Sequence, residues 1–322
     1  MSDVPPLGVV GAGAFGTALA VAEARAGRPV ILWGRDRAAM ERARNGGGVP
    51  RLPGVFLPPG VIATADPRDL RPCETLLVAV PMQQLARALP PLGLAPRSAV
   101  ALCKGVDLET LRGPTAILSA SMPGATVAIL SGPSFAADIA RGLPTALTLG
   151  CGDAEAGAAL QARLATPTLR LYRSGDVTGV ELGGALKNVV AIACGAAVGA
   201  GLGESARAAL MTRGMAEMMR LAPILGARPA TLMGLSGLGD LALTCASPAS
   251  RNFALGLALG AGTPPPVATT EGVATAGAAL RLAERHGIEL PVTRATAALV
   301  AGRLDVRDAM RQLLDRHLTE ES

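Results

Sequence analysis

The stretch that decides the fold is Leu7–Ala20, which reads Leu-Gly-Val-Val-Gly-Ala-Gly-Ala-Phe-Gly-Thr-Ala-Leu-Ala. A short apolar run typical of a buried strand leads into a G-x-G-x-x-G loop, and a helical pattern follows. In such a loop Gly11 permits the tight turn, Gly13 lets the backbone approach a pyrophosphate, and Gly16 lets helix and strand pack closely. The helix start then offers N–H groups to a phosphate. We therefore predict dinucleotide binding here, against the alternative of a purely structural turn.

The next predicted strand, Val30–Trp33, bears on which dinucleotide is preferred. A loop selective for NAD usually places an acidic residue about 20 residues after the glycines, on the ribose hydroxyl. Here the strand is followed by Gly34-Arg35-Asp36-Arg37. The planar guanidinium of Arg35 suits a 2′-phosphate and favours NADP, whereas Asp36 keeps NAD open. The alternative is that both arginines are solvated residues at a helix start.

The first half alternates short apolar runs with helical patterns, which is typical of a parallel sheet covered on both faces. The predicted strands are Leu7–Val10, Val30–Trp33, Leu76–Val80, Ala99–Cys103, Val127–Leu130 and Ala146–Leu149, with Leu169–Tyr172 as one further strand. The predicted helices are Phe15–Ala26, Asp36–Ala43, Gln83–Ala88 and Phe135–Ala140. This pattern predicts an α/β, Rossmann-like, doubly wound sheet over residues 1–178.

After that point long Ala-rich helical patterns take over, and residues 179–322 are predicted to form an all-α domain. The predicted helices are Val180–Val198, Ser205–Leu225, Ala276–His286, Thr293–Ala301 and Val306–Leu318. Gly260–Val267 contains three consecutive prolines and is predicted to be a loop.

Composition excludes several classes of protein. The net charge is +5, but the arginines are scattered and aromatic residues make up only 2%, so no nucleic-acid surface is expected. The apolar stretch Val189–Leu202 is shorter than the ~18 residues of a membrane span and is predicted to be a buried core helix. Five dispersed cysteines suggest buried, reduced thiols in the cytoplasm. No cluster has metal-ligand spacing, and His286 and His317 are expected at the surface.

Two lysines stand out in a chain that otherwise uses arginine. Of 30 basic residues only Lys104 and Lys187 are lysine. Lysine can donate a proton, which arginine does poorly, so these positions are candidates for acid–base chemistry. Lys104 follows a predicted strand at the sheet edge where α/β proteins bind ligands. Lys187 lies in an apolar helix, where an unpaired charge would be costly. The alternative for each is an ordinary solvated cation.

Three further motifs carry polar groups next to glycine or proline. Ser131–Ala136 combines small residues with a hydroxyl before a helix, which suits a phosphate, although Ser134 could simply be an N-cap. In Gly237–Leu241, Asp240 is placed to pair with Lys187 or to cap a helix. Ser250-Arg251-Asn252 suits a phosphate monoester, with a capped helix start before Phe253 as the alternative.

Taken together, these motifs resemble the soluble, bacterial-type NAD(P)-dependent glycerol-3-phosphate dehydrogenase family. The matching stretches are Gly11–Ala20, Leu32–Asp36, Lys104-Gly105, Ser131–Ala136, Gly183–Asn188, Thr212–Glu217, Gly237–Leu241 and Ser250–Asn252. The loop alone is common to many families, whereas G-G-A-x-K-N, G-L-G-D-L and S-R-N in this order are far more specific.

The resemblance implies reversible hydride transfer between NAD(P)H and dihydroxyacetone phosphate, giving sn-glycerol 3-phosphate for phospholipid synthesis, by a homodimer with its active site between the domains. Lys187 is then the general acid/base, held by Asp240, and Lys104 is a second cation at the substrate. Further implied substrate contacts are Gly132, Ser134, Ser250, Arg251 and Asn252. The implied cofactor contacts are Gly11, Gly13, Ala14, Phe15, Gly16, Arg35, Lys104, Ala136, Arg251 and Glu271.

The sequence departs from the family pattern at a few positions. Ala14 replaces a common serine, Cys103 replaces a threonine or serine, and Met82 stands where a serine is usual. The stretch from Phe253 to Thr270 is short and lacks the usual basic residues, which puts the role of Glu271 in doubt.

Two other functions stay open on the sequence alone. One is another lysine-dependent Rossmann dehydrogenase, such as a 3-hydroxyacid dehydrogenase or a ketopantoate reductase, which would accept substrates without phosphate. The other is a non-catalytic dinucleotide sensor, which would not need an acid/base lysine in an apolar helix.

Overall fold

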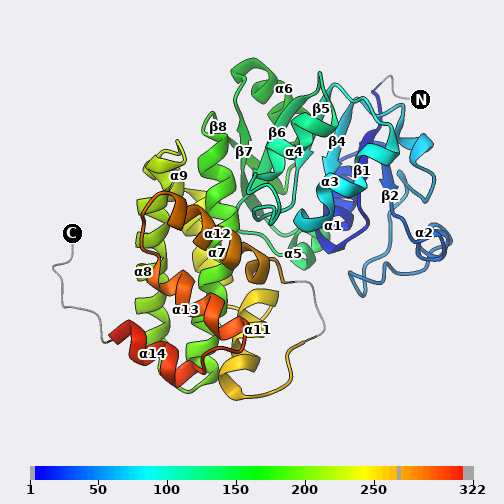
Figure 1. Ribbon diagram of the computed structural model, residues 1–322. Coiled ribbons are helices and arrows are strands. Elements are labelled where there is room, and N and C mark those ends of the chain that lie inside the picture. The colour runs from blue at the N-terminus through cyan, green and yellow to red at the C-terminus, as the bar shows by residue number, and fades with distance from the viewer. Residues whose placement is uncertain (1–3, 267–269, 315–322) are drawn as a thin grey trace. The chain divides into compact units, whose positions relative to one another are not determined.

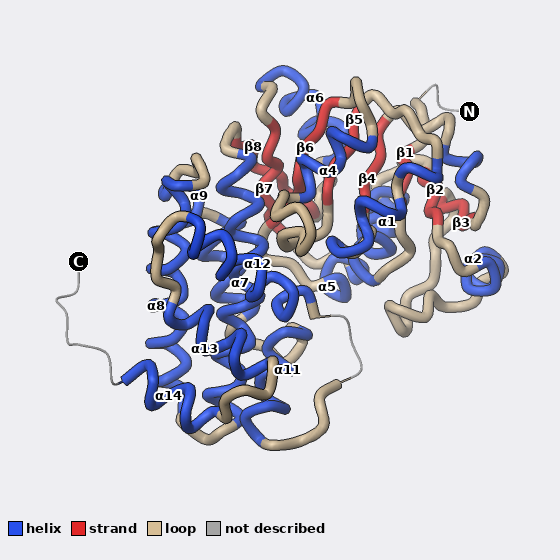
Figure 2. Tube along the Cα trace, in the orientation of Figure 1, coloured by secondary structure: helices blue, strands red, loops and turns tan. Residues whose placement is uncertain are grey.

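The computed structural model describes residues 4–266 and 270–314, and its first half builds one sheet (Figures 1 and 2). The strands are β1 (Leu7–Val10), β2 (Val30–Trp33), β3 (Val61–Thr64), β4 (Thr75–Val78), β5 (Ser98–Ala101), β6 (Thr126–Ser131), β7 (Thr145–Cys151) and β8 (Leu169–Ser174). Their order across the sheet is β3-β2-β1-β4-β5-β6-β7-β8. The chain therefore starts in the middle of the sheet, adds β2 and β3 on one side of β1, and then adds β4 to β8 on the other side. The point between β1 and β4 is the topological switch point at which open α/β sheets bind ligands.

The strands from β1 to β6 run parallel, but β7 is antiparallel to β6, which corrects the prediction of a wholly parallel sheet. The cause is the short connection between them. Its helix, α5 (Ala136–Arg141), has six residues and spans only about 9 Å, too little to return the chain to the opposite edge. The longer α6 (Ala154–Leu164) does return it, and β8 pairs parallel with β7.

Helices cover both faces of the sheet because neighbouring strand residues point to opposite sides. Val9 belongs to a core that also contains residues of α1 (Ala14–Arg25), α5 and α6. Val10 belongs to a second core, formed with α3 (Leu85–Ala88) and α4 (Pro114–Ser121). The other elements here are α2 (Arg37–Arg44) and the short 3-10 turns η1 (Pro67–Leu70), η2 (Met82–Gln84) and η3 (Pro90–Leu92).

The described part of the second half is helical, as predicted. Its elements are α7 (Val177–Gly199), α8 (Gly203–Ile224), α9 (Pro229–Leu232), the π-helical turn η4 (Leu235–Gly239), α10 (Asp240–Thr244), α11 (Arg251–Ala261), α12 (Glu271–Arg285), α13 (Pro291–Val300) and α14 (Val306–Leu314). By length and composition α7 could cross a membrane, but 83% of its most apolar window is buried. It is therefore a core helix, as predicted.

Packing between α7 and α11 depends on glycine. A Cβ at Gly195 would lie 2.2 Å from the Phe253 carbonyl oxygen, and one at Gly256 would lie 2.1 Å from that of Ile192. Gly199 and Gly260 are equally tight against the opposite backbone. These four glycines, which we call the glycine seam, let the two helix backbones touch directly.

The chain forms two compact units. Unit 1 comprises Met1–Lys104 and Arg112–Glu181, and unit 2 comprises Gly105–Leu111 and Leu182–Ser322. The chain passes between the units three times, and the last passage, between Glu181 and Leu182, lies inside α7. The short segment Gly105–Leu111 belongs to the helical unit, where Arg281 donates to the Leu108 carbonyl oxygen at 2.5 Å. The predicted boundary after residue 178 stays a prediction.

Several elements differ from the sequence-based prediction. The edge strand β3 was missed because its apolar run, Val61–Ala63, is only three residues long. The helices α4 and α6 were also missed. The helix α11, whose capped start was the alternative for Ser250, continues to Ala261, inside the predicted loop. β4 and β5 each end two residues earlier than predicted. The last predicted helix is observed to Leu314, and its continuation to Leu318, like His317 and Val267, lies outside the described residues.

Candidate active site

The G-x-G-x-x-G loop has the geometry of a phosphate cradle. Gly11 follows β1 with a φ of +114°, a left-handed conformation that favours glycine. A Cβ at Gly16 would lie 2.3 Å from the Gly11 carbonyl oxygen, so the helix packs tightly onto the turn. A Cβ at Gly13, by contrast, would have no atom of the described chain within 4 Å. Open space over Gly13 is what close approach of a pyrophosphate requires.

The start of α1 fits the same ligand. Gly13 is its N-cap and makes no side-chain capping bond, and the first turn holds no acidic residue. Ala14 and Phe15, the first two helical residues, are half-buried beside the loop. The N–H groups of this turn and the helix dipole favour an anion. The residues present therefore fit the diphosphate of a nicotinamide dinucleotide.

Arg35 and Asp36 differ in how they are engaged. Both follow β2 and are exposed. Asp36 is the N-cap of α2 and accepts a hydrogen bond from the Ala39 backbone N–H at 3.0 Å. Its carboxylate thus has a structural partner within its own helix, whereas Arg35 forms no part of that cap.

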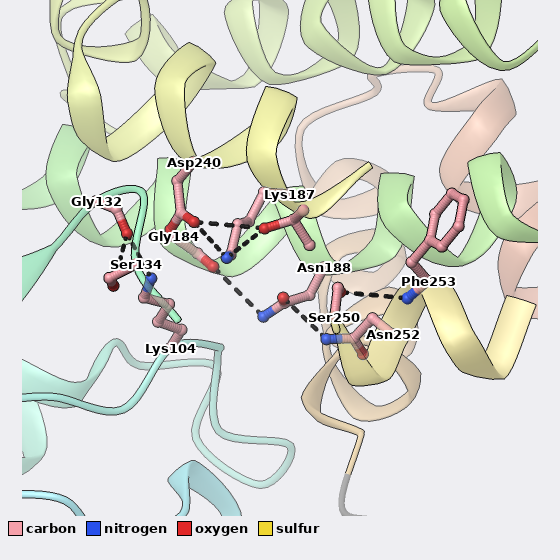
Figure 3. Close-up of polar contacts among 11 residues, drawn as sticks. Lys104, Gly132, Ser134, Gly184, Lys187, Asn188, Asp240, Ser250, Asn252 and Phe253 are labelled. Atoms are coloured by element: carbon pink, nitrogen blue, oxygen red, sulfur yellow. Dashed lines mark hydrogen bonds and ion pairs between the residues drawn. The ribbon is translucent and has the colours of Figure 1, made fainter. Parts of the chain in front are cut away.

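Other predicted residues of unit 1 follow the carboxyl ends of β5 and β6. The Lys104 Nζ donates to the Gly132 carbonyl oxygen at 3.3 Å, and the Ser134 hydroxyl donates to the same oxygen at 3.1 Å (Figure 3). Gly132 has a φ of +148°, so this turn depends on glycine. Ser134 is not an N-cap, because Phe135 holds that position and α5 begins at Ala136.

In unit 2 the predicted partnership of Lys187 and Asp240 is present. The Lys187 Nζ lies 2.5 Å from Oδ1 of Asp240, and their side chains are 9% and 0% exposed (Figure 3). The Thr244 hydroxyl, 2.6 Å from the same nitrogen, is a second partner. Asp240 and Thr244 lie one turn apart on α10, so the short helix presents both oxygens on one face.

Glycine explains how α10 reaches the lysine. Gly183 precedes Lys187 by one turn of α7 and therefore lies on the same face. A Cβ at Gly183 would lie 2.5 Å from the Ser236 carbonyl oxygen of η4. The turn can rest on α7 only because this side chain is missing, and Asp240 follows that turn directly. This contact gives a physical reason for the spacing of G-G-A-x-K-N and G-L-G-D-L.

The thiol of Cys245 adds no negative charge to the surroundings of Lys187. Cys245, next to Thr244, is fully buried. A hydrogen bond with Cys194 and burial raise the pKa of the Cys245 thiol well above its usual value. The thiol is therefore neutral at physiological pH, and Asp240 supplies the counter-charge.

The Ser250–Asn252 motif begins α11. The Ser250 hydroxyl accepts from the Phe253 backbone N–H at 3.3 Å, which is the capping alternative considered from the sequence. Arg251 is exposed, whereas Asn252 is 8% exposed and bonds to the protein. Its Nδ2 donates to Oδ1 of Asn188 at 2.9 Å, and its Oδ1 accepts from the Gly272 N–H at 3.1 Å.

No group of His, Cys, Asp and Glu able to hold a metal occurs within residues 4–266 and 270–314. His286 is exposed, as predicted. The five cysteines are free and buried, and their burial agrees with the prediction.

Comparison with known proteins places these features in a family. A family model described as the NAD-dependent glycerol-3-phosphate dehydrogenase N-terminus matches residues 6–157, and one described as its C-terminus matches residues 176–311. Glycerol-3-phosphate dehydrogenase [NAD(P)+] of Paracoccus denitrificans is 58% identical over 97% of this chain and 99% of its own. The chain belongs to the NAD(P)-dependent glycerol-3-phosphate dehydrogenase family.

A solved structure agrees with this assignment to the glycerol-3-phosphate dehydrogenases. The crystal structure of glycerol-3-phosphate dehydrogenase from Coxiella burnetii is 35% identical, covers 97% of this chain and 99% of that one, and superposes with a TM-score of 0.91. A ketopantoate reductase from Ralstonia eutropha is 21% identical with a TM-score of 0.60. That weaker similarity shows the fold alone, so it does not favour the alternative that the chain is a ketopantoate reductase.

The sequence-based prediction missed two participants in the polar network around Lys187 and Asn252. Thr244 was missed although its place four residues after Asp240 on a helix would have signalled it. Asn188 was quoted only as part of a motif. Its partner Asn252 is 64 residues away along the chain, and no local pattern joins them.

Proposed function

We propose that this chain catalyses the reversible reduction of dihydroxyacetone phosphate to sn-glycerol 3-phosphate with NAD(P)H. The observation that carries the proposal is the buried Lys187–Asp240 pair in a chain that belongs to this family. A buried ammonium held at a fixed place beside a carboxylate suits proton transfer to a developing alkoxide.

In the proposed mechanism the bound reduced nicotinamide supplies the hydride to the substrate carbonyl carbon. Lys187 donates the proton to the carbonyl oxygen and takes it back in the reverse direction. Asp240 and Thr244 fix the position of the Lys187 Nζ by hydrogen bonds of 2.5 and 2.6 Å. Lys104 supplies a second positive charge to the substrate. An oriented proton donor of this kind contributes a factor of about 10²–10⁴ to the rate.

In this proposal Arg251 and Ser250 bind the phosphate group of the substrate, and Gly132 and Ser134 are further substrate contacts. Arg251 is exposed at the start of α11, so its guanidinium is accessible to an anion. A planar guanidinium binds phosphate through paired hydrogen bonds. The Ser250 hydroxyl accepts a bond from its own helix, and its proton can still be donated to a phosphate oxygen.

For the cofactor we propose NADPH in preference to NADH. The support is the contrast between Asp36, whose carboxylate caps α2, and Arg35, which is exposed at the end of β2. A serine in place of Arg35 should raise the KM for NADPH and leave that for NADH nearly unchanged. Gly11, Gly13, Ala14, Phe15, Gly16, Lys104, Ala136, Arg251 and Glu271 are the further cofactor contacts in this proposal.

The deciding experiment follows nicotinamide absorbance with dihydroxyacetone phosphate and each cofactor, comparing wild type with Lys187→Met and Lys187→Arg. Oxidation of NADPH or NADH by the wild type, and its loss in both variants, would support the proposal. The Lys187→Arg variant is informative because arginine keeps the positive charge but is a poor proton donor. Dihydroxyacetone and ketopantoate serve as substrates without phosphate. No oxidation with either cofactor, despite measurable cofactor binding, would overturn the proposal.

We also propose a cytoplasmic homodimer that supplies glycerol phosphate for phospholipids, following the family resemblance. Buried, free cysteines in the described chain suit a reducing compartment. Light scattering on the purified chain tests the dimer, and cell fractionation tests the location.

A further inference from the structure

A row of hydrogen bonds joins three helices of unit 2. Asn188 belongs to α7, Asn252 to α11 and Gly272 to α12. Asn252 donates to Oδ1 of Asn188 at 2.9 Å and accepts from the Gly272 N–H at 3.1 Å (Figure 3 shows the asparagine pair). The side chains of Asn188 and Asn252 are almost fully buried, so water competes little for these bonds.

Each member of this row is the chain neighbour of a proposed ligand-binding residue. Lys187 precedes Asn188, Arg251 precedes Asn252, and Glu271 precedes Gly272. Arg251 is also the first residue of α11, and Glu271 is the first residue of α12. Because consecutive residues share a backbone, the hydrogen bonds of the row also hold the Cα atoms of Lys187, Arg251 and Glu271 in place.

The groups of this row are closely packed. A Cβ at Gly272 would lie 2.7 Å from the Asn188 carbonyl oxygen and 2.8 Å from Oδ1 of Asn252. The glycine seam already holds α7 and α11 in backbone contact. A shift of α12 is therefore passed to Asn252, and α11 has no flexible side chains at the seam to absorb it.

We propose that the row Asn188–Asn252–Gly272 is a positioning device that couples cofactor binding at the start of α12 to substrate binding at the start of α11. The proposal rests on the function proposed above. Asn252 acts mainly through its neighbours, since both its carbonyl and its amide are engaged by the protein. Coupling of this kind is reciprocal, so each ligand should tighten binding of the other by the same factor.

The most specific test adds a methyl group at Gly272 and removes no polar group. Gly272→Ala keeps every polar side chain but pushes on the Asn252 carbonyl. Gly277→Ala is the matched control, because it lies on the same helix and a Cβ there has no described atom within 4 Å. We expect Gly272→Ala to raise both the KM for dihydroxyacetone phosphate and the Kd for NADPH, each by roughly tenfold. Gly277→Ala should match wild type.

The coupling itself is measured by NADPH fluorescence. The Kd for NADPH is determined with and without glycerol 3-phosphate, in wild type, Gly272→Ala and Gly277→Ala. We expect the ratio of the two Kd values to fall towards one only in Gly272→Ala. Equal ratios in the three proteins would overturn the proposal. The NADPH titration without glycerol 3-phosphate needs neither turnover nor substrate binding. An inactive wild type would therefore count against the proposed function, while the NADPH Kd values of Gly272→Ala and Gly277→Ala could still be compared.

A second set of variants decides the matter if Gly272→Ala does not fold, as judged by thermal melting. Asn188→Ala, Asn252→Ala and the double variant form a thermodynamic cycle. If the two residues act as one row, the double variant should bind NADPH no more weakly than the poorer single variant. Additive losses, or an effect of Asn252→Ala on substrate KM alone, would mean independent ligand contacts and would overturn the proposal.

Discussion

The Nζ atom of Lys187 lies 2.5 Å from Oδ1 of Asp240, and neither side chain is more than 9% exposed. In a buried pair of this kind the cost of desolvation is offset by close geometry and further hydrogen bonds, here the one that Lys187 donates to the Thr244 hydroxyl. Removing one partner leaves the other charge buried without compensation. The pair is therefore important both for stability and for the proposed chemistry, and the two effects can be separated.

Asp240→Asn keeps the shape of the side chain and removes its charge. We expect kcat to fall about 100-fold, and the free energy of unfolding to fall by about 3 kcal/mol because Lys187 loses its counter-charge. Steady-state kinetics and urea unfolding measure the two effects. The control is Asp138→Asn, which removes an exposed ion pair with Arg141 and should change neither quantity. An unchanged kcat in Asp240→Asn would contradict the assigned role.

Thr244→Val removes the second hydrogen bond to Lys187 and keeps the volume of the side chain. We expect kcat to fall roughly tenfold, since a lost hydrogen bond to a buried charged group is worth about 1.5–3 kcal/mol. Thr244→Ser restores the hydroxyl and should recover most of the rate. The KM for NADPH should not change. If serine and valine behave alike, the hydroxyl is not the important group.

Alanine at two glycines of the cofactor loop should have different effects, one on cofactor binding and the other on stability. At Gly13 a Cβ meets no described atom, so Gly13→Ala should fold normally and raise the Kd for NADPH by roughly tenfold or more. At Gly16 a Cβ would lie 2.3 Å from the Gly11 carbonyl oxygen, so Gly16→Ala should lower the melting temperature. Melting curves and cofactor titration of both variants test this. Normal cofactor binding by Gly13→Ala would contradict the proposed pyrophosphate position.

Glu23 makes stability depend on pH. Its carboxylate is 1% exposed and 2.5 Å from Arg28, and Oε1 has no hydrogen-bond partner among the described residues. Burial outweighs Arg28 and raises the pKa of Glu23 from 4.5 to about 7. The folded state therefore holds this proton more firmly than the unfolded state. The resulting stability is complete below about pH 4.5 and is lost as the pH rises through about 7.

Glu23→Gln should consequently weaken the fall in melting temperature between pH 5 and pH 8 by a few degrees. Glu204→Gln is the control, because Glu204 forms an ion pair with Arg207 while 72% exposed. That variant should keep the wild-type slope, which also includes Glu181 and Glu217, because desolvation raises the pKa of each of these carboxyls. Parallel slopes for Glu23→Gln and wild type would show that burial does not raise this pKa.

Local patterns were sufficient to predict the first strand, the glycine loop and the helical character of the second half. They were sufficient because buried parallel strands and amphipathic helices leave distinct periodicities. They were insufficient for β7, whose direction depends on the length of α5, and for β3, whose apolar run is only three residues long.

The candidate site divides in the same way. Lys187 was predicted because a charge in an apolar helix needs a partner, and Asp240 was predicted to be that partner. The row through Asn188, Asn252 and Gly272 was not predicted, since it joins helices whose register depends on the glycine seam. Hydrogen bonds between distant buried amides leave no periodic signal in a sequence.

The scarcity of lysine has a practical consequence for labelling. Apart from the N-terminal amine, an amine-selective reagent has only Lys104 and Lys187 to modify. Lys104 is half-buried, while the Lys187 side chain is 9% exposed and is held by Asp240 and Thr244. Acylation followed by mass spectrometry should therefore modify Lys104 first, and protection by added ligands would give a footprint with almost no background from the rest of the surface.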